Sequence, residues 1–336
     1  MSFERAKLIA IVLGCMGAVA CGGSEPAADD GPVCNELPPL ELKDSYRIGF
    51  AQLWEDHGPW RDANTASMQD EALARGYDFE FDPGTSPDPA EQVGRMHDLI
   101  ESKVDAIFIA PHDETVLAPS VVQARRACIP VFVVDRAVDT QVAIPGEDYV
   151  SYLASDFRLE GELAAEWLIE ATNGEARIIE LEGTIGSSPG VQRKQGFDER
   201  IDSEPGMTIL ASESADFNEE KGYEATLRLM EDNPTANVIY SHNDAMSFGV
   251  ITALEELGLV PGEDVLVVSI DGTRKAIEYV LEGKIGVVVE CNPKFGPVAY
   301  DTMLEYARGE DVPLRVNNVD RVFDINNAAD YLPEAY

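Results

Sequence analysis

Six short apolar runs in this chain of 336 residues each end abruptly in polar residues. The runs are rich in β-branched residues, and segments that are apolar throughout are typical of strands buried on both faces of a parallel sheet. They lie at 107–112, 131–136, 178–183, 238–244, 265–272 and 287–292. Because open α/β sheets bind ligands beyond the carboxyl ends of their strands, the polar residues that end these runs predict a ligand site. They include Asp135, Arg136, Asn243 and Asp271.

The chain alternates between strand and helix patterns along most of its length. We expect strands near 46–52, 78–82, 105–110, 131–135, 176–182, 207–213, 237–241, 265–270, 286–290 and 321–325. Helices are expected near 61–75, 89–103, 114–127, 157–173, 190–203, 218–232, 243–258, 273–282 and 294–309. Alternating strands and helices imply parallel sheets. Ten strands are more than a single hydrophobic core usually holds. We therefore expect an α/β fold of two Rossmann-like lobes, with the break after the fourth strand, in segment 137–152.

The first 20 residues have the pattern of an export signal. A weakly cationic start precedes an apolar stretch over 8–20, which is too short to cross a bilayer. Small residues before Cys21 resemble a lipoprotein cleavage site and predict a lipid on Cys21, while Cys15 is a competing site. The alternative is an ordinary secretory signal with an incidental cysteine. Either interpretation predicts export, and the composition of 21–43 indicates a tether.

Charge and cysteine usage exclude several classes of function. The formal net charge is −37, which repels nucleic acid and anionic membrane surfaces. Apart from Cys15 and Cys21, the chain has Cys34, Cys128 and Cys291, with no Cys-x-x-Cys pair, and we expect them to be free buried thiols. The four histidines lack metal-binding spacing, so we expect no metal and no cofactor.

Two pairs of neighbouring residues offer sugar-binding chemistry. Trp60 and Arg61 can stack on a sugar ring and donate to its hydroxyls, although the tryptophan could equally anchor its loop on the core. Asp216 and Phe217 provide an acceptor and a stacking platform in another loop.

Two of the strand ends carry candidate polar contacts for a ligand. Asp135 and Arg136 can bind a vicinal diol, or form a structural ion pair. Asn243 can cap the following helix, or offer its amide to a ligand. Arg193, in the helix after 176–182, can point back toward these strand ends.

The segment Gly186-Ser187-Ser188-Pro189-Gly190 matches the nucleophile elbow of serine hydrolases. The oxyanion hole of those enzymes uses the backbone N–H of the residue after the serine. Proline at 189 has no N–H, and the only downstream histidine is His242, on a separate strand end. We therefore do not expect an enzyme, since the sequence offers no nucleophile and base in one place.

Eight motifs, in order over 46–321, resemble the periplasmic sugar-binding proteins of ABC importers. The resemblance is to their ribose-type branch, whose core is shared with lac-repressor-type regulators, and it is greatest to the galactofuranose binders. The motifs are Ile48-Gly49-Phe50 with Trp60-Arg61, 104–111, 129–136, Gly196-Phe197, Ala215-Asp216-Phe217, His242-Asn243-Asp244, 269–272 and Glu290-Cys291-Asn292-Pro293.

The resemblance implies a type I periplasmic binding protein fold with a ligand cleft between two lobes. The N-terminal lobe is expected to comprise 44–154 and 292–321, and the C-terminal lobe 155–291 and 322–336. The family positions that match are Trp60, Arg61, Asp135 and Arg136 on the first lobe, and Arg193, Phe217, Asn243 and Asp271 on the second. Asp216 and Glu290 complete the predicted site as further carboxylates of the cleft.

The resemblance further implies a monomeric binding protein of the periplasm, lipid-anchored to a bacterial membrane, which delivers a monosaccharide to an ABC permease in the inner membrane. Because arginines and carboxylates roughly cancel in the cleft, a neutral sugar such as a furanose is expected. The alternative is a sugar-sensing receptor that presents its ligand to a chemoreceptor or histidine kinase.

Three departures from the family leave the sugar open. The loop 52–59 carries an extra Trp54 and Pro59, and loop 82–88 lacks the Gln- or Asn-rich sequence that often contacts sugar hydroxyls. Cys291 stands where ribose binders have a glutamine.

Overall fold

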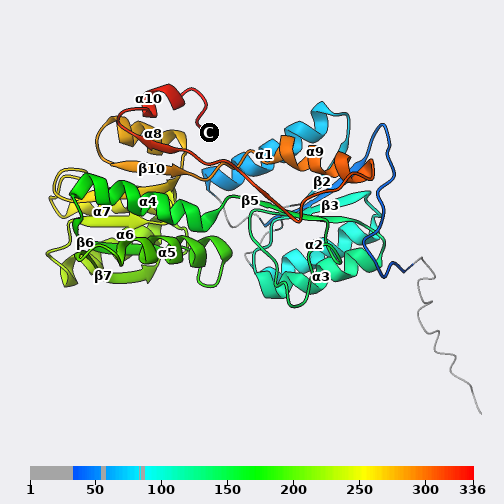
Figure 1. The fold of residues 1–336 in the computed structure, drawn as a ribbon, viewed down its shortest axis with the longest axis horizontal. Coiled ribbons are helices and arrows are strands. Elements are labelled where there is room, and N and C mark those ends of the chain that lie inside the picture. The colour runs from blue at the N-terminus through cyan, green and yellow to red at the C-terminus, as the bar shows by residue number, and fades with distance from the viewer. Residues whose placement is uncertain (1–32, 54–57, 83, 85–87) are drawn as a thin grey trace, which may run out of the picture. The chain divides into compact units, whose positions relative to one another are not determined.

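The computed structural model describes residues 33–336 except 54–57, 83 and 85–87, and the described part forms one compact unit. The predicted signal segment, the lipid site Cys21 and the extra Trp54 lie outside the described residues. The fold is α/β, with two sheets of six strands each (Figure 1). We call the parts built on these sheets the N-terminal and C-terminal lobes; the residue boundaries between them stay a prediction.

The first sheet is entirely parallel, with strand order β11-β5-β4-β3-β1-β2. Its strands are β1 (Arg47–Ala51), β2 (Asp78–Phe81), β3 (Ala106–Ile109), β4 (Val131–Val134), β5 (Ser151–Ala154) and β11 (Arg315–Asn317). The helices of this lobe are α1 (Pro59–Ala74), α2 (Pro89–Glu101), α3 (Glu114–Arg126) and α9 (Gly296–Ala307). Every residue of β3 and β4 is buried, as their apolar sequences predict.

The second sheet has strand order β12-β10-β9-β8-β6-β7. Its strands are β6 (Glu175–Glu182), β7 (Gly206–Ser214), β8 (Val238–Ser241), β9 (Leu266–Asp271), β10 (Val287–Glu290) and β12 (Val322–Asp324). Its helices are α4 (Phe157–Thr172), α5 (Ser188–Ile201), α6 (Glu219–Asp232), α7 (Asp244–Glu256), α8 (Arg274–Leu281) and α10 (Ala328–Tyr331). The sheet departs from the expected parallel arrangement at one edge, because β12 pairs with β10 in the antiparallel direction.

Two short strands of the first sheet were not predicted. Strand β5 begins at the end of the segment 137–152 and extends two residues beyond it. The first sheet therefore continues for one strand more than expected. The edge strand β11 has the polar sequence Arg-Val-Asn, which lacks a strand pattern. Both pair in parallel with each other and extend the sheet beyond β4.

The chain passes between the two sheets three times, after β5, after β10 and between β11 and β12 (Figure 1). These crossovers are bonded to one another. Asp320 Oδ1 accepts from the backbone N–H of Asn292, and Asn318 Nδ2 donates to the carbonyl of Asn292. The Cys291 thiol lies 3.7 Å from Ser155 Oγ. The three crossovers therefore meet beside the strand ends where the site was predicted.

Helices α4 and α5 pack so closely that glycine is required at their contact. A Cβ on Gly161 would lie 2.1 Å from the carbonyl oxygen of Arg193, and a Cβ on Gly196 would lie 2.0 Å from that of Arg158. Because backbones can approach this closely only without side chains between them, the glycines set the spacing of the two helices. The contact brings Glu160 of α4 next to Arg193 of α5.

The expectation of three free thiols was wrong for two of them. Cys34 and Cys128 form a disulfide across 94 residues of sequence, whereas Cys291 is free and buried. The backbone N–H of Cys34 also donates to Arg126, and Leu40 is buried in the N-terminal lobe. The last part of the predicted tether, 33–43, thus packs on the protein. Within the described residues, no helix is long and apolar enough to cross a membrane.

Candidate functional site

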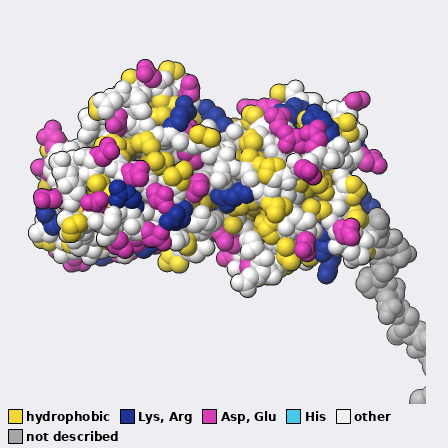
Figure 2. Space-filling view, viewed as in Figure 1, with side chains coloured by type: hydrophobic (Ala, Val, Ile, Leu, Met, Phe, Trp, Pro, Cys, Tyr) yellow, Lys and Arg dark blue, Asp and Glu magenta, His cyan; other side chains and the backbone are white. Residues whose placement is uncertain are grey.

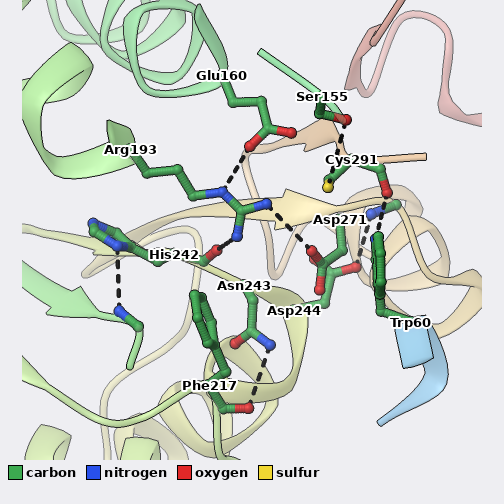
Figure 3. A network of polar contacts seen from close by, with 12 residues as sticks. Trp60, Ser155, Glu160, Arg193, Phe217, His242, Asn243, Asp244, Asp271 and Cys291 are labelled. Carbon is green, nitrogen blue, oxygen red and sulfur yellow. Dashed lines mark hydrogen bonds and ion pairs between the residues drawn. The ribbon is translucent and has the colours of Figure 1, made fainter. Parts of the chain in front are cut away.

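A cavity of about 710 Å³, part of it open to solvent, lies at the carboxyl ends of both sheets. It is lined by Gly58, Pro59, Trp60, Arg61, Asp135, Arg136, Pro189, Arg193, Asp216, Phe217, Asn218, Asn243, Ala245, Asp271, Thr273 and Cys291. Nine of the ten predicted site residues are in this set, and they come from both lobes. Figure 3 shows several of them around Arg193.

Glu290 is the predicted site residue that the structure places elsewhere. Its carboxylate accepts from Arg321 Nε at 2.8 Å and from Arg321 Nη2 at 3.0 Å, and the Tyr331 hydroxyl lies 3.3 Å away. Successive side chains of a strand point to opposite faces. Cys291, the next residue, reaches the cavity, so Glu290 must point away from it.

The N-terminal lobe contributes a wall built on the start of α1 and the end of β4. Arg61 Nη1 lies 2.6 Å from Asp135 Oδ2, and the Arg61 guanidinium lies 4.9 Å from the centre of the Trp60 ring. Asp135 therefore pairs with Arg61 rather than with its neighbour Arg136, whose Nη1 donates to the carbonyl of His112. The predicted ion pair of adjacent residues is not formed, and both side chains line the cavity instead.

Trp60 is anchored on the core and also lines the cavity, while its stacking on a sugar stays a prediction. Its ring packs against Phe295, and its Nε1–H donates to the carbonyl of Cys291 at 2.7 Å. It also lines the cavity. The tryptophan is thus anchored on the second crossover while one part of its ring stays available to a ligand.

In the C-terminal lobe, a single buried arginine organises the wall. Arg193 Nε donates to Glu160 Oε2 at 2.6 Å, and its Nη1 donates to the carbonyl of His242 at 2.6 Å. Its Nη2 lies 3.9 Å from Asp271 Oδ1 (Figure 3). Burial opposes the charge, but Glu160, Cys291 and Asp271 together outweigh burial and raise the pKa of Arg193. A guanidinium held by several partners presents its remaining donors in a fixed direction.

Phe217 forms an aromatic wall of the cavity. Its ring lies over the backbone of Gly183, where an added Cβ would meet Phe217 Cζ at 1.9 Å. The guanidinium carbons of Arg136 and Arg193 lie 5.9 Å and 5.8 Å from the ring centre, one from each lobe. Glycine at 183 is therefore what allows the ring to lie against the C-terminal lobe.

Asn243 caps helix α7 and also lines the cavity, while its contact with a ligand stays a prediction. Its Oδ1 accepts from the backbone N–H of Met246, and its Nδ2 donates to the carbonyl of Phe217 at 3.4 Å. The next residue, Asp244, points away from the cavity and accepts from Ser269, Gly272 and Thr273. Asp244 thus shapes the turn that follows Asp271.

Four of the lining residues have left-handed backbone conformations. The φ angles are 61° for Asp135, 57° for Asp216, 56° for Phe217 and 133° for Asp271. Such angles are costly for residues with a side chain, about 1–3 kcal/mol each, and they gather at functional sites. These backbone angles change the direction in which the side chains at the strand ends point. Burial, followed by the nearby Asp244 carboxylate, raises the pKa of Asp271 well above its ordinary value.

Ser188 joins the two lobes rather than serving as a nucleophile. Its Oγ accepts from the backbone N–H of Ala137 at 3.0 Å, and it faces Glu114 of α3. The ring of His242 instead contacts Glu180 and the N–H of Gly183. Burial raises the pKa of Glu114 in spite of its contacts with Ser188.

Two polar lining residues, Asn218 and Thr273, were not predicted from the sequence. Each is the N-cap of the helix that follows a strand of the second sheet, α6 after β7 and α8 after β9. An Asn or Thr just after a strand end is a signal that could have identified both, because helix caps and ligand contacts share this edge of the sheet.

Comparison with known proteins agrees with this architecture. The sequence profile of the periplasmic binding protein domain matches residues 48–311. The galactofuranose-binding protein YtfQ of Escherichia coli (strain K12) is 34% identical over 278 residues, covering 82% of this chain and 86% of that protein.

Two solved structures share the fold. A galactofuranose-binding protein superposes with a TM-score of 0.81 at 32% identity, over 86% of this chain and 97% of that one. The binding protein of the arabinose ABC transporter of Shewanella sp. ANA-3, bound to α- and β-L-arabinofuranose, has a TM-score of 0.79 at 31% identity, over 86% and 95%. The chain therefore belongs to the periplasmic binding protein family, in its non-enzymatic group of sugar-binding proteins of ABC importers.

Proposed function

We propose that this protein binds a neutral monosaccharide, in a furanose ring form, in the cavity between its lobes and delivers it to an ABC permease. The observation that carries the proposal is that the arginines of the cavity already face carboxylates of the protein. Three arginines (61, 136, 193) and three aspartates (135, 216, 271) line it. Arg61 is paired with Asp135, and Arg193 is paired with Glu160 behind the wall. Arg136 lies near the Glu114 carboxylate and interacts with it electrostatically. An anionic ligand would need an arginine whose charge is not already balanced.

The same residues supply the contacts that a sugar requires. Asp135 and Asp271 can accept hydrogen bonds from hydroxyl groups, arginine N–H groups can donate, and the Asn243 amide can do both. Trp60 and Phe217 can stack on the apolar faces of a sugar ring, one from each lobe. Because each lobe holds part of this set, a bound sugar would stabilise the conformation in which both walls meet it.

The furanose form is supported by the related proteins. YtfQ is named for galactofuranose, and the arabinose-transporter structure contains arabinofuranose. These observations favour a five-membered ring without selecting one sugar.

Location and anchoring complete the proposal. The Cys34–Cys128 disulfide supports an oxidising compartment, as expected for an exported protein. Lipid attachment at Cys21 would tether the protein to the membrane that holds the permease. Acidic side chains are spread over the visible face of both lobes (Figure 2), which suits a binding protein that avoids nucleic acid and anionic lipid.

Thermal-shift and calorimetric titration would test the ligand class. D-galactose, L-arabinose and D-ribose should raise the melting temperature, whereas galacturonate and sugar phosphates should not. Tighter binding of the anionic compounds would contradict the charge argument. Ring form is tested with the methyl furanoside and methyl pyranoside of L-arabinose, which differ in ring size and cannot interconvert. Preference for the pyranoside would exclude the furanose proposal.

Two further measurements identify the natural sugar and the role. Mass spectrometry of the undenatured protein would identify any co-purified sugar. Radiolabelled uptake by cells that carry or lack the chain separates import from sensing, because a sensor would leave uptake unchanged.

A further inference from the structure

His242 lies directly behind the aromatic wall of the cavity but does not line it. It follows β8, its side chain is fully buried, and its ring packs against that of Tyr240 at 4.9 Å. Its Nε2 lies 3.0 Å from Glu180 Oε1, and its Nδ1 lies 3.3 Å from the backbone nitrogen of Gly183. Figure 3 labels His242 and marks this contact of its ring with a dashed line.

The two contacts select one protonation state of the ring. A backbone N–H can only donate, so Nδ1 must accept from Gly183 and carries no proton. The proton then sits on Nε2 and is donated to the Glu180 carboxylate. Burial lowers the pKa of His242 against the opposing pull of Glu180, in agreement with a neutral ring.

Gly183 connects the ring of His242 with the aromatic wall of the cavity. The ring of Phe217 lies against the α-carbon of Gly183, and the carbonyl of Gly183 accepts from Ser214 Oγ at 2.6 Å. Both polar groups of this glycine are thus fixed, its N–H by His242 and its carbonyl by Ser214. The backbone carbonyl of His242 in addition accepts from Arg193 Nη1.

We propose that His242 is a positioning residue of the sugar site, which in its neutral form holds Gly183 and so seats Phe217 on the cavity wall. The proposal rests on the proposed function in one respect, namely that Phe217 contacts the sugar. Protonation of Nδ1 would turn the acceptor into a donor facing the Gly183 N–H, and the glycine and the aromatic ring would lose their support.

Several charged groups surround the ring and influence its titration. Glu180 and Glu182 of β6 favour the protonated form, whereas Arg193 of α5 disfavours it. Glu180 also contacts Lys194 of α5 and Ser212 of β7. Tyr240 of β8 packs on the ring. A pH effect therefore has to be assigned with variants of His242 itself.

Two substitutions separate the contacts of the ring. His242→Asn keeps an acceptor close to the Nδ1 position and removes the donor to Glu180. His242→Gln can keep a donor to Glu180 and leaves the Gly183 N–H without its acceptor. We expect His242→Gln to weaken D-galactose binding about tenfold and His242→Asn about threefold or less. Circular dichroism and melting temperature establish that each variant is folded.

Hydrogen exchange of the Gly183 amide, followed by NMR in the sugar-free protein, reports on the support directly. Exchange should be at least about tenfold faster in His242→Gln than in His242→Asn, because only the latter keeps an acceptor. In the unsubstituted protein, the Gly183 resonance should titrate as the pH falls below about 6.5, because burial lowers the pKa of His242, and D-galactose affinity should fall with it. His242→Asn should lose this part of the pH dependence.

Equal Gly183 exchange in the two variants, or a Gly183 resonance that does not follow the ionisation of His242, would overturn the positioning role. The second result needs no substituted protein, so it decides the matter even if a variant fails to fold. Failure of D-galactose and the other sugars to bind the unsubstituted protein would instead count against the proposed function, because the exchange measurements need no ligand.

Discussion

The two walls of the cavity are supported in different ways. On the C-terminal lobe, Arg193 is held by Glu160 and by the His242 carbonyl, and Phe217 lies on Gly183, so the wall rests on buried groups of its own lobe. On the N-terminal lobe, Trp60 is bonded to the carbonyl of Cys291, in a crossover between the lobes. The C-terminal wall is thus preorganised from within its lobe, whereas the N-terminal wall combines its own Arg61–Asp135 pair with an anchor of Trp60 on the hinge.

The largest effect should follow from removing the centre of the C-terminal wall. Arg193→Met would leave Glu160 buried without its cation, which typically costs about 3–5 kcal/mol of unfolding free energy. Sugar affinity should fall more than about hundredfold. Denaturant unfolding and calorimetry measure the two losses.

Arg193→Lys is the matched control for this change. Lysine keeps the positive charge but lacks the planar guanidinium with its fixed N–H donors. Compared with Arg193→Met, it should therefore recover part of the stability and little of the affinity. Full stability in Arg193→Met would show that the C-terminal wall does not rest on this arginine.

Asp271→Ala should separate binding from stability on the same wall. Sugar hydroxyls that face Asp271 would lose an acceptor in a buried site, and affinity should fall about tenfold to a few hundredfold. Because burial raises the pKa of Asp271, its charge is costly in the folded state, and the melting temperature without sugar should not fall. A large drop in melting temperature together with unchanged affinity would reverse the assigned role.

Gly183→Ala tests the support of the aromatic wall. The new methyl group would collide with the Phe217 ring and push it from its place, which should weaken sugar binding about tenfold. If displacement of the ring is the cause, Gly183→Ala should add no further loss in a Phe217→Ala background. Additive losses in this double-mutant cycle would place the effect of the methyl group elsewhere.

Trp60→Phe addresses the N-terminal wall. It keeps an aromatic face but removes the N–H that donates to Cys291, a bond worth about 0.5–1.5 kcal/mol. Because that bond ties the wall to a crossover, we expect slower closure on rapid mixing with sugar as well as an affinity loss of about three- to tenfold. Altered affinity with unaltered closure kinetics would mean that this wall, too, is independent of the hinge.

Ser188→Ala should have the smallest effect. The serine accepts from Ala137 across the lobes, so its loss should weaken sugar binding about two- to fivefold, through the closed conformation alone. Small-angle scattering with saturating sugar gives the control, since both proteins should reach the same compact form. Complete loss of binding would require a direct role for Ser188 that the structure does not indicate.

The sequence predicted the parts of this protein that depend on local patterns. Continuous apolar runs identified the buried strands, and four of the polar residues that end them, Asp135, Arg136, Asn243 and Asp271, line the cavity. Strands β5 and β11 were not predicted because each is short and β11 is polar. Only their pairing within the sheet makes them strands. Glu290 was misplaced because one step along a strand reverses the direction of a side chain.

Other features depend on contacts distant in sequence. Cys34 and Cys128 are 94 residues apart, and their pairing requires that the segment before β1 lie against the end of α3. The support of Phe217 by Gly183, and of Gly183 by His242, likewise joins three separate strand ends. Such arrangements follow from the packed fold rather than from any local spacing.

The Cys34–Cys128 disulfide determines where a mechanical load would enter the folded protein. Tension on the chain before residue 34 passes through the covalent bond into the connection between α3 and β4. Strand β4 lies inside the first sheet, between β5 and β3, where extraction requires hydrogen bonds on both sides to break. The load path bypasses segment 35–127 of the chain and therefore spares β1 and the start of α1. A pull on the N-terminal end would leave Trp60 and Arg61 unloaded.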